Sequence, residues 1–254
     1  MIQLPPSFLQ HPIAHRALHD ITDARPENSR AAIRAALSAG YGIEIDVQLS
    51  ADRVAIVFHD YDLGRLTGTH GAVAQRRQQE LAGIPLTGGD EGIPDLTETL
   101  NLIAGKVPLL IEIKDQDGAM GSDIGPLETA VADALASYTG PVALMSFNPH
   151  SVARMADLCP SIPRGLVTSS YDPQDWPLSN EICAHLRHIP DFDRVGASFI
   201  SHEAKDLNRP RVHELKRQGA SVLCWTVRSP MEEATARKVA QNITFEGYLP
   251  AGSA

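Results

Sequence analysis

Short apolar runs alternate with alanine-rich, helix-forming stretches along the whole chain, and this alternation constrains the fold more than any other feature. We expect strands at residues 13–15, 43–47, 109–113, 142–146, 165–168, 195–200, 222–227 and 243–246. We expect helices at residues 28–39, 96–104, 127–137, 149–157, 180–187, 209–218 and 231–239. Continuous apolar strands are typical of a buried parallel sheet, and their alternation with helices predicts an α/β fold.

The number of strands and the chain length favour a closed barrel over an open sheet. The chain has 254 residues, of which 43% are apolar, and α/β barrels of about this length form one domain. An open doubly wound sheet usually carries a glycine-rich phosphate loop after an early strand. Here the first strand ends in His15-Arg16-Ala17 instead. We therefore predict a (β/α)8 TIM barrel that forms a single domain over residues 1–254.

One segment interrupts the alternation of strands and helices. Residues 54–58 have the pattern of a strand and follow the second barrel strand after a short turn at 50–53, which predicts a hairpin. The stretch at 61–94 is rich in glycine, proline and polar residues. Excursions of this length in a barrel usually carry function, so we expect a small inserted lid or subdomain after the second strand.

Charge and cysteine content limit the classes of partner and compartment. The net charge is −9 and no dense cluster of lysine and arginine is present, so we expect no nucleic-acid partner. Three separated cysteines without a CxxC motif argue against a disulfide framework or a structural zinc site. The N-terminus lacks the pattern of a signal peptide, and no apolar run reaches ~20 residues. We expect a cytoplasmic protein without stable membrane insertion; the sequence leaves the oligomeric state open.

Charged residues lie inside two of the apolar strands. Glu44 and Asp46 are two positions apart and therefore share one face of their strand, which in a barrel faces the interior. Glu112 and Lys114 have the same relationship in the next barrel strand. Neighbouring carboxylates repel each other and resist burial, and a hard divalent cation relieves both costs. The pattern indicates a three-carboxylate metal site with a lysine that neutralises a phosphate.

Two histidines fall at strand ends, where α/β barrels place their active sites. His15 ends the first strand and His59 follows the hairpin strand. Taken singly, a Glu-x-Asp pair is more often a surface face, and a lone histidine is more often structural. The coincidence of several ionisable groups with apolar strands is instead typical of a functional site. An acid and a base on opposite sides of a phosphodiester would suit two histidines.

These residues together resemble the glycerophosphodiester phosphodiesterase family. The shared motifs are His15-Arg16-Ala17, Pro26-Glu27-Asn28-Ser29, Glu44-Ile45-Asp46-Val47, Asp52-Arg53 through His59-Asp60, and Glu112-Ile113-Lys114. The resemblance is strong over the first half of the chain and weaker over the second. It implies a barrel with a small insertion that hydrolyses glycerophosphodiesters to glycerol 3-phosphate and an alcohol.

The resemblance also implies a role for individual residues. His15 and His59 correspond to the catalytic pair, and Arg16 and Lys114 to the groups that bind the phosphate. Glu44, Asp46 and Glu112 correspond to the ligands of a divalent metal ion, Mg²⁺ or Ca²⁺. Trp225 stands where the family often presents an aromatic side chain to the alcohol. The expected partner is a small-molecule phosphodiester.

The sequence departs from the family pattern at both ends. Ala17 replaces a glycine, and the loop that follows it, residues 17–25, is slightly longer than usual and contains His19. The family commonly ends in Gly-x-Asp-Gly-Ile-x-Thr-Asp, whose final aspartate is missing from residues 242–247. His202 and Glu203 are further candidates for the pocket because they follow a predicted strand.

Several alternatives remain at this point. A related phospholipase D- or C-like enzyme would act on lysophospholipids or another phosphodiester, but it should expose apolar residues at its mouth, and the 61–94 stretch is polar. A non-catalytic binding protein on the same scaffold should lack at least one of these histidines or carboxylates, and all are present. A barrel with unrelated metal chemistry, such as an aldolase or isomerase, should carry a Schiff-base or enolate arrangement, and the sequence shows no clear one. The sequence leaves open the alcohol, the metal, which histidine is the base, and whether water or a glycerol hydroxyl attacks.

Overall fold

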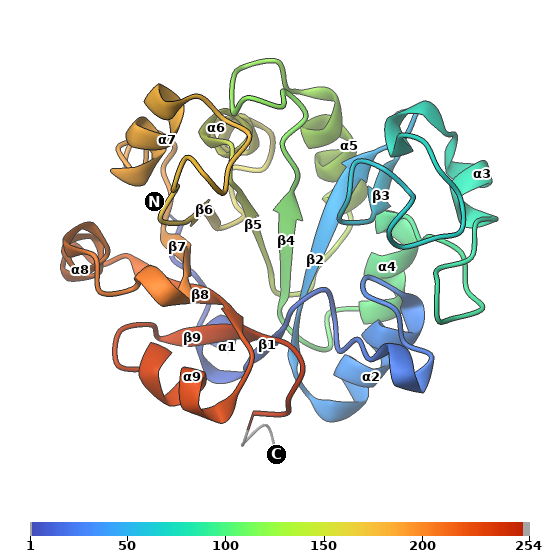
Figure 1. The fold of residues 1–254 in the computed structure, drawn as a ribbon, viewed down its shortest axis with the longest axis horizontal. Coiled ribbons are helices and arrows are strands. Elements are labelled where there is room, and N and C mark those ends of the chain that lie inside the picture. The colour runs from blue at the N-terminus through green and yellow to red at the C-terminus, as the bar shows by residue number, and fades with distance from the viewer. Residues whose placement is uncertain (1, 251–254) are drawn as a thin grey trace.

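The computed structural model describes residues 2–250, which form a closed barrel of eight parallel strands surrounded by helices (Figure 1). The barrel strands are β1 (Ile13–Ala14), β2 (Gly42–Leu49), β4 (Leu109–Ile113), β5 (Val142–Ser146), β6 (Arg164–Thr168), β7 (Phe199–Glu203), β8 (Ser221–Val227) and β9 (Asn242–Phe245). Each strand pairs with the next in this order, and β9 pairs with β1 to close the ring. The predicted TIM barrel is confirmed.

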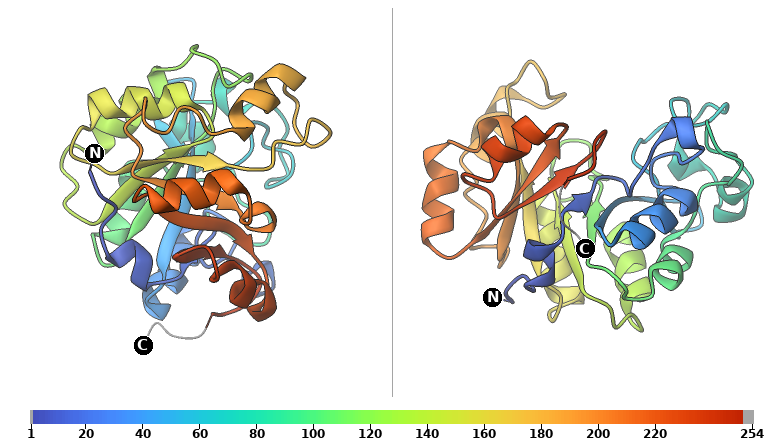
Figure 2. Two further views of the ribbon diagram at one scale, coloured as in Figure 1. Left: turned by 90° about the vertical axis from the view of Figure 1, so that its left-hand side faces the viewer. Right: turned by 90° about the horizontal axis from the view of Figure 1, so that it is seen from below.

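Helices cover the outside of the barrel, as the three views show (Figures 1 and 2). They are α2 (Arg30–Ala39), α4 (Leu96–Ile103), α5 (Pro126–Leu135), α6 (Pro149–Leu158), α7 (Asn180–Arg187), α8 (Pro210–Arg217) and α9 (Pro230–Ala236). Local capping fixes the ends of α2: the Ser29 side chain accepts a hydrogen bond from Ala32 N–H, and Gly40 ends the helix with a φ of 72°. Shorter pieces are α1 (Ser7–Gln10), α3 (Gln78–Ala82) and three 3₁₀ turns, η1 (Ile21–Asp23), η2 (Val73–Gln75) and η3 (Ala204–Asp206).

The strands divide the apolar side chains between two cores. Ile43, Ile45 and Val47 of β2 point outward and pack in the large cluster between the sheet and the helices. The alternate positions of each strand point inward, where a smaller cluster that includes Leu110 and Phe199 fills the lower part of the barrel. Because side chains alternate along a strand, Glu44 and Asp46 of β2 must face the interior.

One strand boundary in the sequence analysis was wrong. We predicted a strand at residues 195–200, whereas β7 spans Phe199–Glu203. Val195 and Ala197 are buried in the outer core although they lie before the strand, in a turn where Gly196 has a φ of 61°. A buried turn and a buried strand both give an apolar run, so hydropathy cannot separate them. The other seven predicted barrel strands agree with the structure to within two residues.

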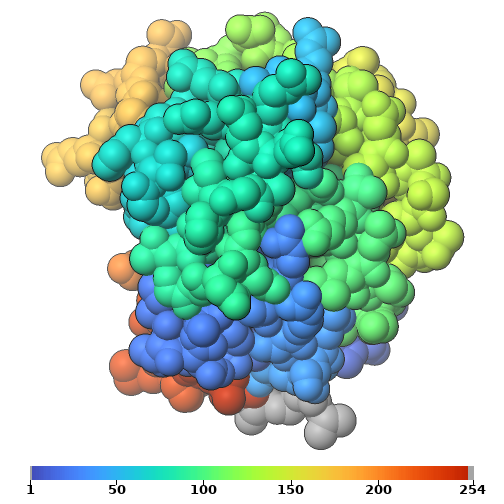
Figure 3. All heavy atoms as spheres, turned by 90° about the vertical axis from the view of Figure 1, so that its right-hand side faces the viewer, coloured from blue at the N-terminus to red at the C-terminus, as the bar shows by residue number. Residues whose placement is uncertain are grey.

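The insertion packs beside the barrel around a core of its own. It begins with β3 (Ala55–Val57), which pairs antiparallel with β2 in the register Val47↔Val57, so the predicted hairpin is confirmed. The stretch at 61–94 is mostly irregular and encloses a small apolar cluster of Ile56, Phe58, Leu63, Val73, Leu81, Leu86 and Ile93. Figure 3 shows this segment, in cyan and green, spread over one face of the molecule next to α2. Among the described residues no helix combines the length and the apolarity that crossing a membrane needs.

Phe8 closes the lower end of the barrel and provides a test of this packing. Its side chain is fully buried in the inner cluster, and its carbonyl accepts a hydrogen bond from Asn242 Nδ2 at 2.7 Å. We expect Phe8→Ala to lower the free energy of unfolding by about 3–5 kcal/mol, the usual cost of an emptied aromatic site. Urea denaturation measures this, with Ile21→Ala as the control because Ile21 is exposed. A loss no larger than that of the control would contradict the closure by α1.

Candidate functional site

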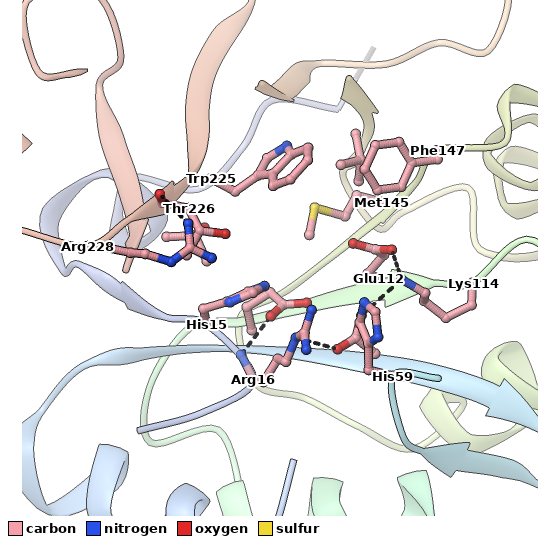
Figure 4. Close-up of a pocket in the computed structure, with 14 residues that line it drawn as sticks. His15, Arg16, His59, Glu112, Lys114, Met145, Phe147, Trp225, Thr226 and Arg228 are labelled. Atoms are coloured by element: carbon pink, nitrogen blue, oxygen red, sulfur yellow. Dashed lines mark hydrogen bonds and ion pairs between the residues drawn. The ribbon is translucent and has the colours of Figure 1, made fainter. Parts of the chain in front are cut away.

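The eight residues to which the resemblance assigns a role all line one pocket at the carboxyl ends of the barrel strands (Figure 4). The pocket has a volume of about 140 Å³. It brings together His15, Arg16, Glu44, Asp46, His59, Glu112, Lys114 and Trp225. The side chains of Met145, Phe147, Val167, Thr226, Arg228 and Thr244 complete the wall. We call this cavity the carboxylate pocket.

Three carboxylates form the floor of the carboxylate pocket. Asp46 of β2 stands opposite Glu112 of β4 in the sheet register, and Glu44 lies one inward position earlier on β2. Each of the three residues offers an oxygen that lies within 4.8 Å of the other two. All three residues are buried, with at most 8% of their surface exposed. The sequence places Glu44 and Asp46 on one face of β2, but Glu112 joins them only because β2 and β4 are neighbouring strands.

Within this cluster, the protein does not compensate the negative charge of Glu44. Burial raises the pKa of Glu44 well above its ordinary value, and the neighbouring charges of Asp46 and Glu112 raise it further. One Glu44 oxygen accepts the backbone N–H of Arg16 at 2.8 Å, while the other, Oε1, is buried without a hydrogen-bond partner among the described residues. A divalent cation bound by carboxylate oxygens would satisfy this atom and remove the repulsion, so the donor set fits such an ion.

Asp46 differs from Glu44 because cations surround it. Burial opposes its ionisation, but Lys114, His59 and Arg16 outweigh burial and hold the pKa of Asp46 below its usual range. Lys114 Nζ lies 3.4 Å from Asp46 Oδ1 and 2.7 Å from Glu112 Oε1. Arg16 Nε lies 3.6 Å from Asp46 Oδ2 and, although buried, has no hydrogen-bond partner in the part of the chain described. Arg16 thus has a donor free for an oxygen of a bound molecule.

The Pro26-Glu27-Asn28-Ser29 motif connects α2 to this pocket. Ser29 caps the helix, and Asn28 Nδ2 donates to Asp46 Oδ2 at 3.0 Å. Glu27 accepts hydrogen bonds from Arg16 at 2.7 Å and from Arg65 of the insertion at 2.9 Å. The motif therefore orients one carboxylate and one arginine of the pocket, and through Arg65 it also ties the insertion to the barrel.

The backbone after β1 takes a conformation that favours glycine at the position of Ala17. Arg16 and Ala17 have φ values of 52° and 64°, in the left-handed region where residues with a Cβ are strained. The turn directs Arg16 N–H toward Glu44, and Ala17 N–H donates to the Glu44 carbonyl at 2.9 Å. These contacts hold β1 against β2 in the observed conformation.

Each of the two histidines is backed by a carboxylate. His15 Nδ1 lies 2.5 Å from Glu246 Oε2, and His59 Nδ1 lies 2.6 Å from Asp60 Oδ1. A carboxylate that accepts from Nδ1 leaves Nε2 as the ring atom available to a ligand. Burial lowers the pKa of His15 below 6.5, although the hydrogen bond that Glu246 accepts from it opposes this shift, so the ring is neutral at pH 7.

An arginine in turn holds each of these carboxylates. Arg228 donates to Glu246 at 2.8 Å, and Arg65 donates to Asp60 at 2.6 Å. Burial opposes the ionised form of Glu246, but the His15 hydrogen bond leads the contacts that hold its pKa below the usual range. For Asp60, Arg65 and His59 outweigh burial and lower the pKa to about 2. Both carboxylates are therefore ionised at pH 7.

Glu246 and Arg228 were missed in the sequence analysis. We noted that the final aspartate of the family pattern is absent, and the structure places Glu246, one position past β9, against His15. The available signal was a carboxylate at the carboxyl end of the last strand, where barrel sites form. Arg228 follows β8 in the same way and lines the pocket.

The two further candidates, His202 and Glu203, and also His19, lie outside the carboxylate pocket. His202 points outward from β7, is fully buried, and bonds to Thr168 Oγ1 at 2.8 Å and Asp206 at 3.2 Å, so it does not face the pocket. Glu203 accepts the backbone N–H of Ser170 at 2.9 Å. His19 lies 3.5 Å from Glu246 and forms with it and His15 a second close group of possible metal ligands. In that group both oxygens of Glu246 already accept hydrogen bonds, from His15 and Arg228. Glu44 Oε1 in the carboxylate cluster has no such partner among the described residues.

Comparisons with known proteins identify relatives of this chain. The sequence profile described as the Glycerophosphoryl diester phosphodiesterase family matches residues 15–243. The protein YhdW of Bacillus subtilis is 30% identical over 237 residues, which cover 89% of this chain and 88% of the relative. A glycerophosphodiester phosphodiesterase of Caldanaerobacter subterraneus is 29% identical, over 85% of this chain and 84% of the relative.

Solved structures show the same fold at lower identity. An Oleispira antarctica phosphodiesterase, solved in complex with the product sn-glycerol-3-phosphate, superposes with a TM-score of 0.77 and is 23% identical, covering 94% of each chain. A glycerophosphodiester phosphodiesterase from Parabacteroides distasonis gives a TM-score of 0.72 at 23% identity, covering 93% of this chain and 92% of the other.

Proposed function

Because the chain belongs to the glycerophosphoryl diester phosphodiesterase family and is thus a phosphoric diester hydrolase, we propose that the carboxylate pocket is its active site. There it hydrolyses glycerophosphodiesters to glycerol 3-phosphate and an alcohol, with a divalent cation and two histidines. The observation that carries the proposal is the convergence of three buried carboxylates and two carboxylate-backed histidines in one cavity.

Glu44, Asp46 and Glu112 would hold the cation, and Mg²⁺ and Ca²⁺ both suit their oxygens. When bound, such an ion supplies a Lewis acid that polarises a phosphoryl oxygen. Asn28 fixes the orientation of Asp46, and the backbone of Arg16 fixes that of Glu44. The three side chains are therefore held in place before a ligand arrives, which favours binding with little reorganisation.

Arg16 and Lys114 would bind the phosphate. The unpartnered Nε of Arg16 and the Nζ of Lys114 both line the pocket beside the carboxylates. Burial disfavours the charge of Lys114, but Glu112 and Asp46 outweigh it and raise the lysine pKa, so the ammonium stays charged. Two fixed positive charges are suited to the charge that develops on a phosphoryl group.

His15 would act as the base and His59 as the acid. His15 is neutral at pH 7, as a base requires, and Glu246 orients it and stabilises the charge that it acquires with a proton. His59 would give a proton to the leaving alcohol through Nε2, held by Asp60 at Nδ1. The attacking group, water or a hydroxyl of the glycerol, would pass its proton to His15.

Turnover of simple diesters tests the proposal. We expect release of glycerol 3-phosphate from glycerophosphocholine and glycerophosphoethanolamine, abolished by EDTA and restored by Mg²⁺, Ca²⁺ or Mn²⁺. The cation that restores the highest rate identifies the metal ion that the site prefers. Folded protein that cleaves neither diester with any of these cations would overturn the proposal.

Replacement of Glu246 tests the role assigned to His15. We expect Glu246→Ala to lower kcat about 10- to 100-fold, as is usual when the carboxylate behind a functional histidine is removed. The hydrogen bond and charge of Glu246 raise the pKa of His15, so its loss lowers that pKa. Because a base must be neutral, the acidic limb of the rate profile should then shift to lower pH.

The matched control for this variant is Glu214→Gln, on the outer helix α8, where the side chain is 45% exposed. It should change neither kcat nor the pH profile. An acidic limb that stays in place in Glu246→Ala would show that Glu246 does not act through His15.

A further inference from the structure

A second cavity adjoins the carboxylate pocket on the side of His59. It has a volume of about 450 Å³ and shares His59, Glu112, Lys114, Phe147 and Trp225 with the carboxylate pocket. Its outer wall is formed by Met120, from the loop after β4, and by Trp176, Pro177 and Leu178, from the loop after β6. We call this cavity the apolar cleft. A group bound there would be contiguous with a phosphate bound at the carboxylates.

Aromatic rings build the inner wall of the apolar cleft. The ring of Phe147 lies 5.0 Å from that of Trp176 and 5.5 Å from that of Trp225, measured between centroids. Trp225 Nε1 donates to the Ser201 carbonyl at 3.0 Å, so its polar atom is used inside the barrel. Figure 4 shows Trp225 and Phe147 standing together beyond Glu112 and Lys114. The rings therefore present apolar surface next to the charged floor.

The polar groups at the edge of the cleft are already bonded to the protein. Tyr61 OH donates to the Asp115 carbonyl at 2.6 Å. The Asp115 carboxylate accepts from Gly118 N–H at 2.8 Å and from Asn148 Nδ2 at 2.8 Å. Asp60 is held by Arg65 and His59. A polyol or sugar that enters this cleft would lose its hydrogen bonds to water and find no replacement for them. An apolar group has no such hydrogen bonds to lose.

Resting on the proposed function, we propose that the apolar cleft binds the acyl chain of a monoacyl glycerophosphodiester, that is, of a lysophospholipid. In the reaction water adds to phosphorus, the P–O bond to the headgroup alcohol breaks, and that oxygen takes a proton. The acylglycerol phosphate remains, with its chain in the cleft. Pockets of this size that are mostly apolar and carry a few polar groups at one end are typical of such ligands.

A quaternary ammonium headgroup is the other group that aromatic rings could attract. The cleft fits it less well, because Met120, Pro177 and Leu178 offer no aromatic face and Lys114 places a positive charge at the inner end. The carboxylates at the edge are engaged by Arg65 and by backbone N–H groups, so they do not offer a free counter-charge. Aliphatic and aromatic surface together match an alkyl chain.

The apolar residues at the mouth lie outside the segment in which we expected them. The argument from sequence against an acylated substrate rested on the polarity of residues 61–94. Of that stretch only Tyr61 lines the apolar cleft, and the apolar wall comes from residues 120 and 176–178. These loops follow different strands and come together only when the barrel closes.

The test compares choline release from glycerophosphocholine with release from its butanoyl, hexanoyl and octanoyl esters, all at concentrations below micelle formation. We expect kcat/KM to rise about fourfold for each methylene that enters the cleft, the factor that corresponds to ~0.8 kcal/mol per buried methylene. The gain should level off when the cleft is full. A kcat/KM for the octanoyl ester within about threefold of that for glycerophosphocholine would overturn the inference.

Variants locate the effect in the cleft. Trp176→Ala and Met120→Gln should each lower the ratio of the octanoyl to the unacylated kcat/KM. Met231→Gln is the matched control, because Met231 is exposed on α9 and lies outside the cleft, and it should keep the wild-type ratio. A ratio unaffected by Trp176→Ala and Met120→Gln would overturn the inference.

The outcomes separate this inference from the proposed function. If glycerophosphocholine is cleaved but acylation gives no gain, the acyl site fails and the phosphodiesterase proposal stands. If Trp176→Ala instead lowers turnover of choline esters relative to ethanolamine esters at every chain length, the cleft binds the headgroup and the inference is overturned. If no diester is cleaved by folded protein, the proposed function itself fails.

Discussion

Glu44→Gln should abolish hydrolysis and, at the same time, stabilise the protein in the absence of divalent cations. A metal ion acting as a Lewis acid is worth several kcal/mol in the transition state, and each 1.36 kcal/mol is tenfold in rate, so kcat/KM should fall about 10³-fold or more. The opposite effect on stability arises because the pKa of Glu44 is raised by burial and by the nearby carboxylates. An amide removes the buried charge and can still accept from Arg16 N–H, so we expect a gain of about 1–3 kcal/mol.

Chemical denaturation in EDTA and in excess Ca²⁺ or Mg²⁺ measures both effects. Cation at 100 times its Kd should stabilise the wild type by about 2.7 kcal/mol and leave Glu44→Gln unchanged. The sign of the pH dependence follows from the raised pKa. Glu44 ionises at lower pH in the unfolded chain than in the folded protein, so it reduces stability as pH rises above the unfolded pKa, and the cation-free wild type should approach the variant as pH falls from neutral.

The control for Glu44→Gln is Glu214→Gln, whose side chain is 45% exposed. It should keep both the activity and the stabilisation by cation. A Glu44→Gln protein that is less stable than the wild type in EDTA would contradict the view that the three carboxylates repel one another.

His15→Ala and His59→Ala should each lower kcat by about 10²- to 10⁴-fold, the range that general acid–base catalysis contributes. The stabilisation by cation should persist, because neither histidine belongs to the carboxylate group. The double variant should be little slower than the slower single variant, since residues that act on one bond are strongly non-additive.

The pH profile of the wild type gives an independent measure of His15. Burial lowers the pKa of His15 below its ordinary 6.5, so the neutral base persists into weakly acidic solution and the acidic limb should lie below that pH. His150→Ala on α6 is the control, because His150 is exposed and lies outside the pocket. A single-histidine variant that retains more than about a tenth of the wild-type kcat would exclude that residue as acid or base.

Local pattern predicted much of the barrel and of the charged site. The alternation of apolar strands and helices is a local property, so it fixed the order of elements to within a few residues. The period of two along a strand placed Glu44 and Asp46 on one face, and the structure shows that face to be the interior. A buried turn and a buried strand have the same apolar pattern, which is why the boundary of β7 was misplaced.

The contact behind His15 depends on residues far apart in the chain, whereas Asp60 directly follows His59. Glu246 reaches His15 only because β9 pairs with β1 and closes the ring, and Arg228 reaches Glu246 from the end of the adjacent strand β8. The sequence pattern predicted a closed barrel, but it did not show which side chains the closure would bring together. The shape of the apolar cleft has the same origin, since Met120 and Trp176 belong to loops that follow strands β4 and β6.

The sequence by itself determined the type and order of the elements and the residues that carry charge into the barrel, because period and propensity act over a few neighbouring residues. Only the tertiary structure decided which carboxylate backs His15, and that an apolar cleft adjoins the charged floor. These features come from loops at the ends of different strands. Their conformations are set by contacts between distant residues once the ring has closed.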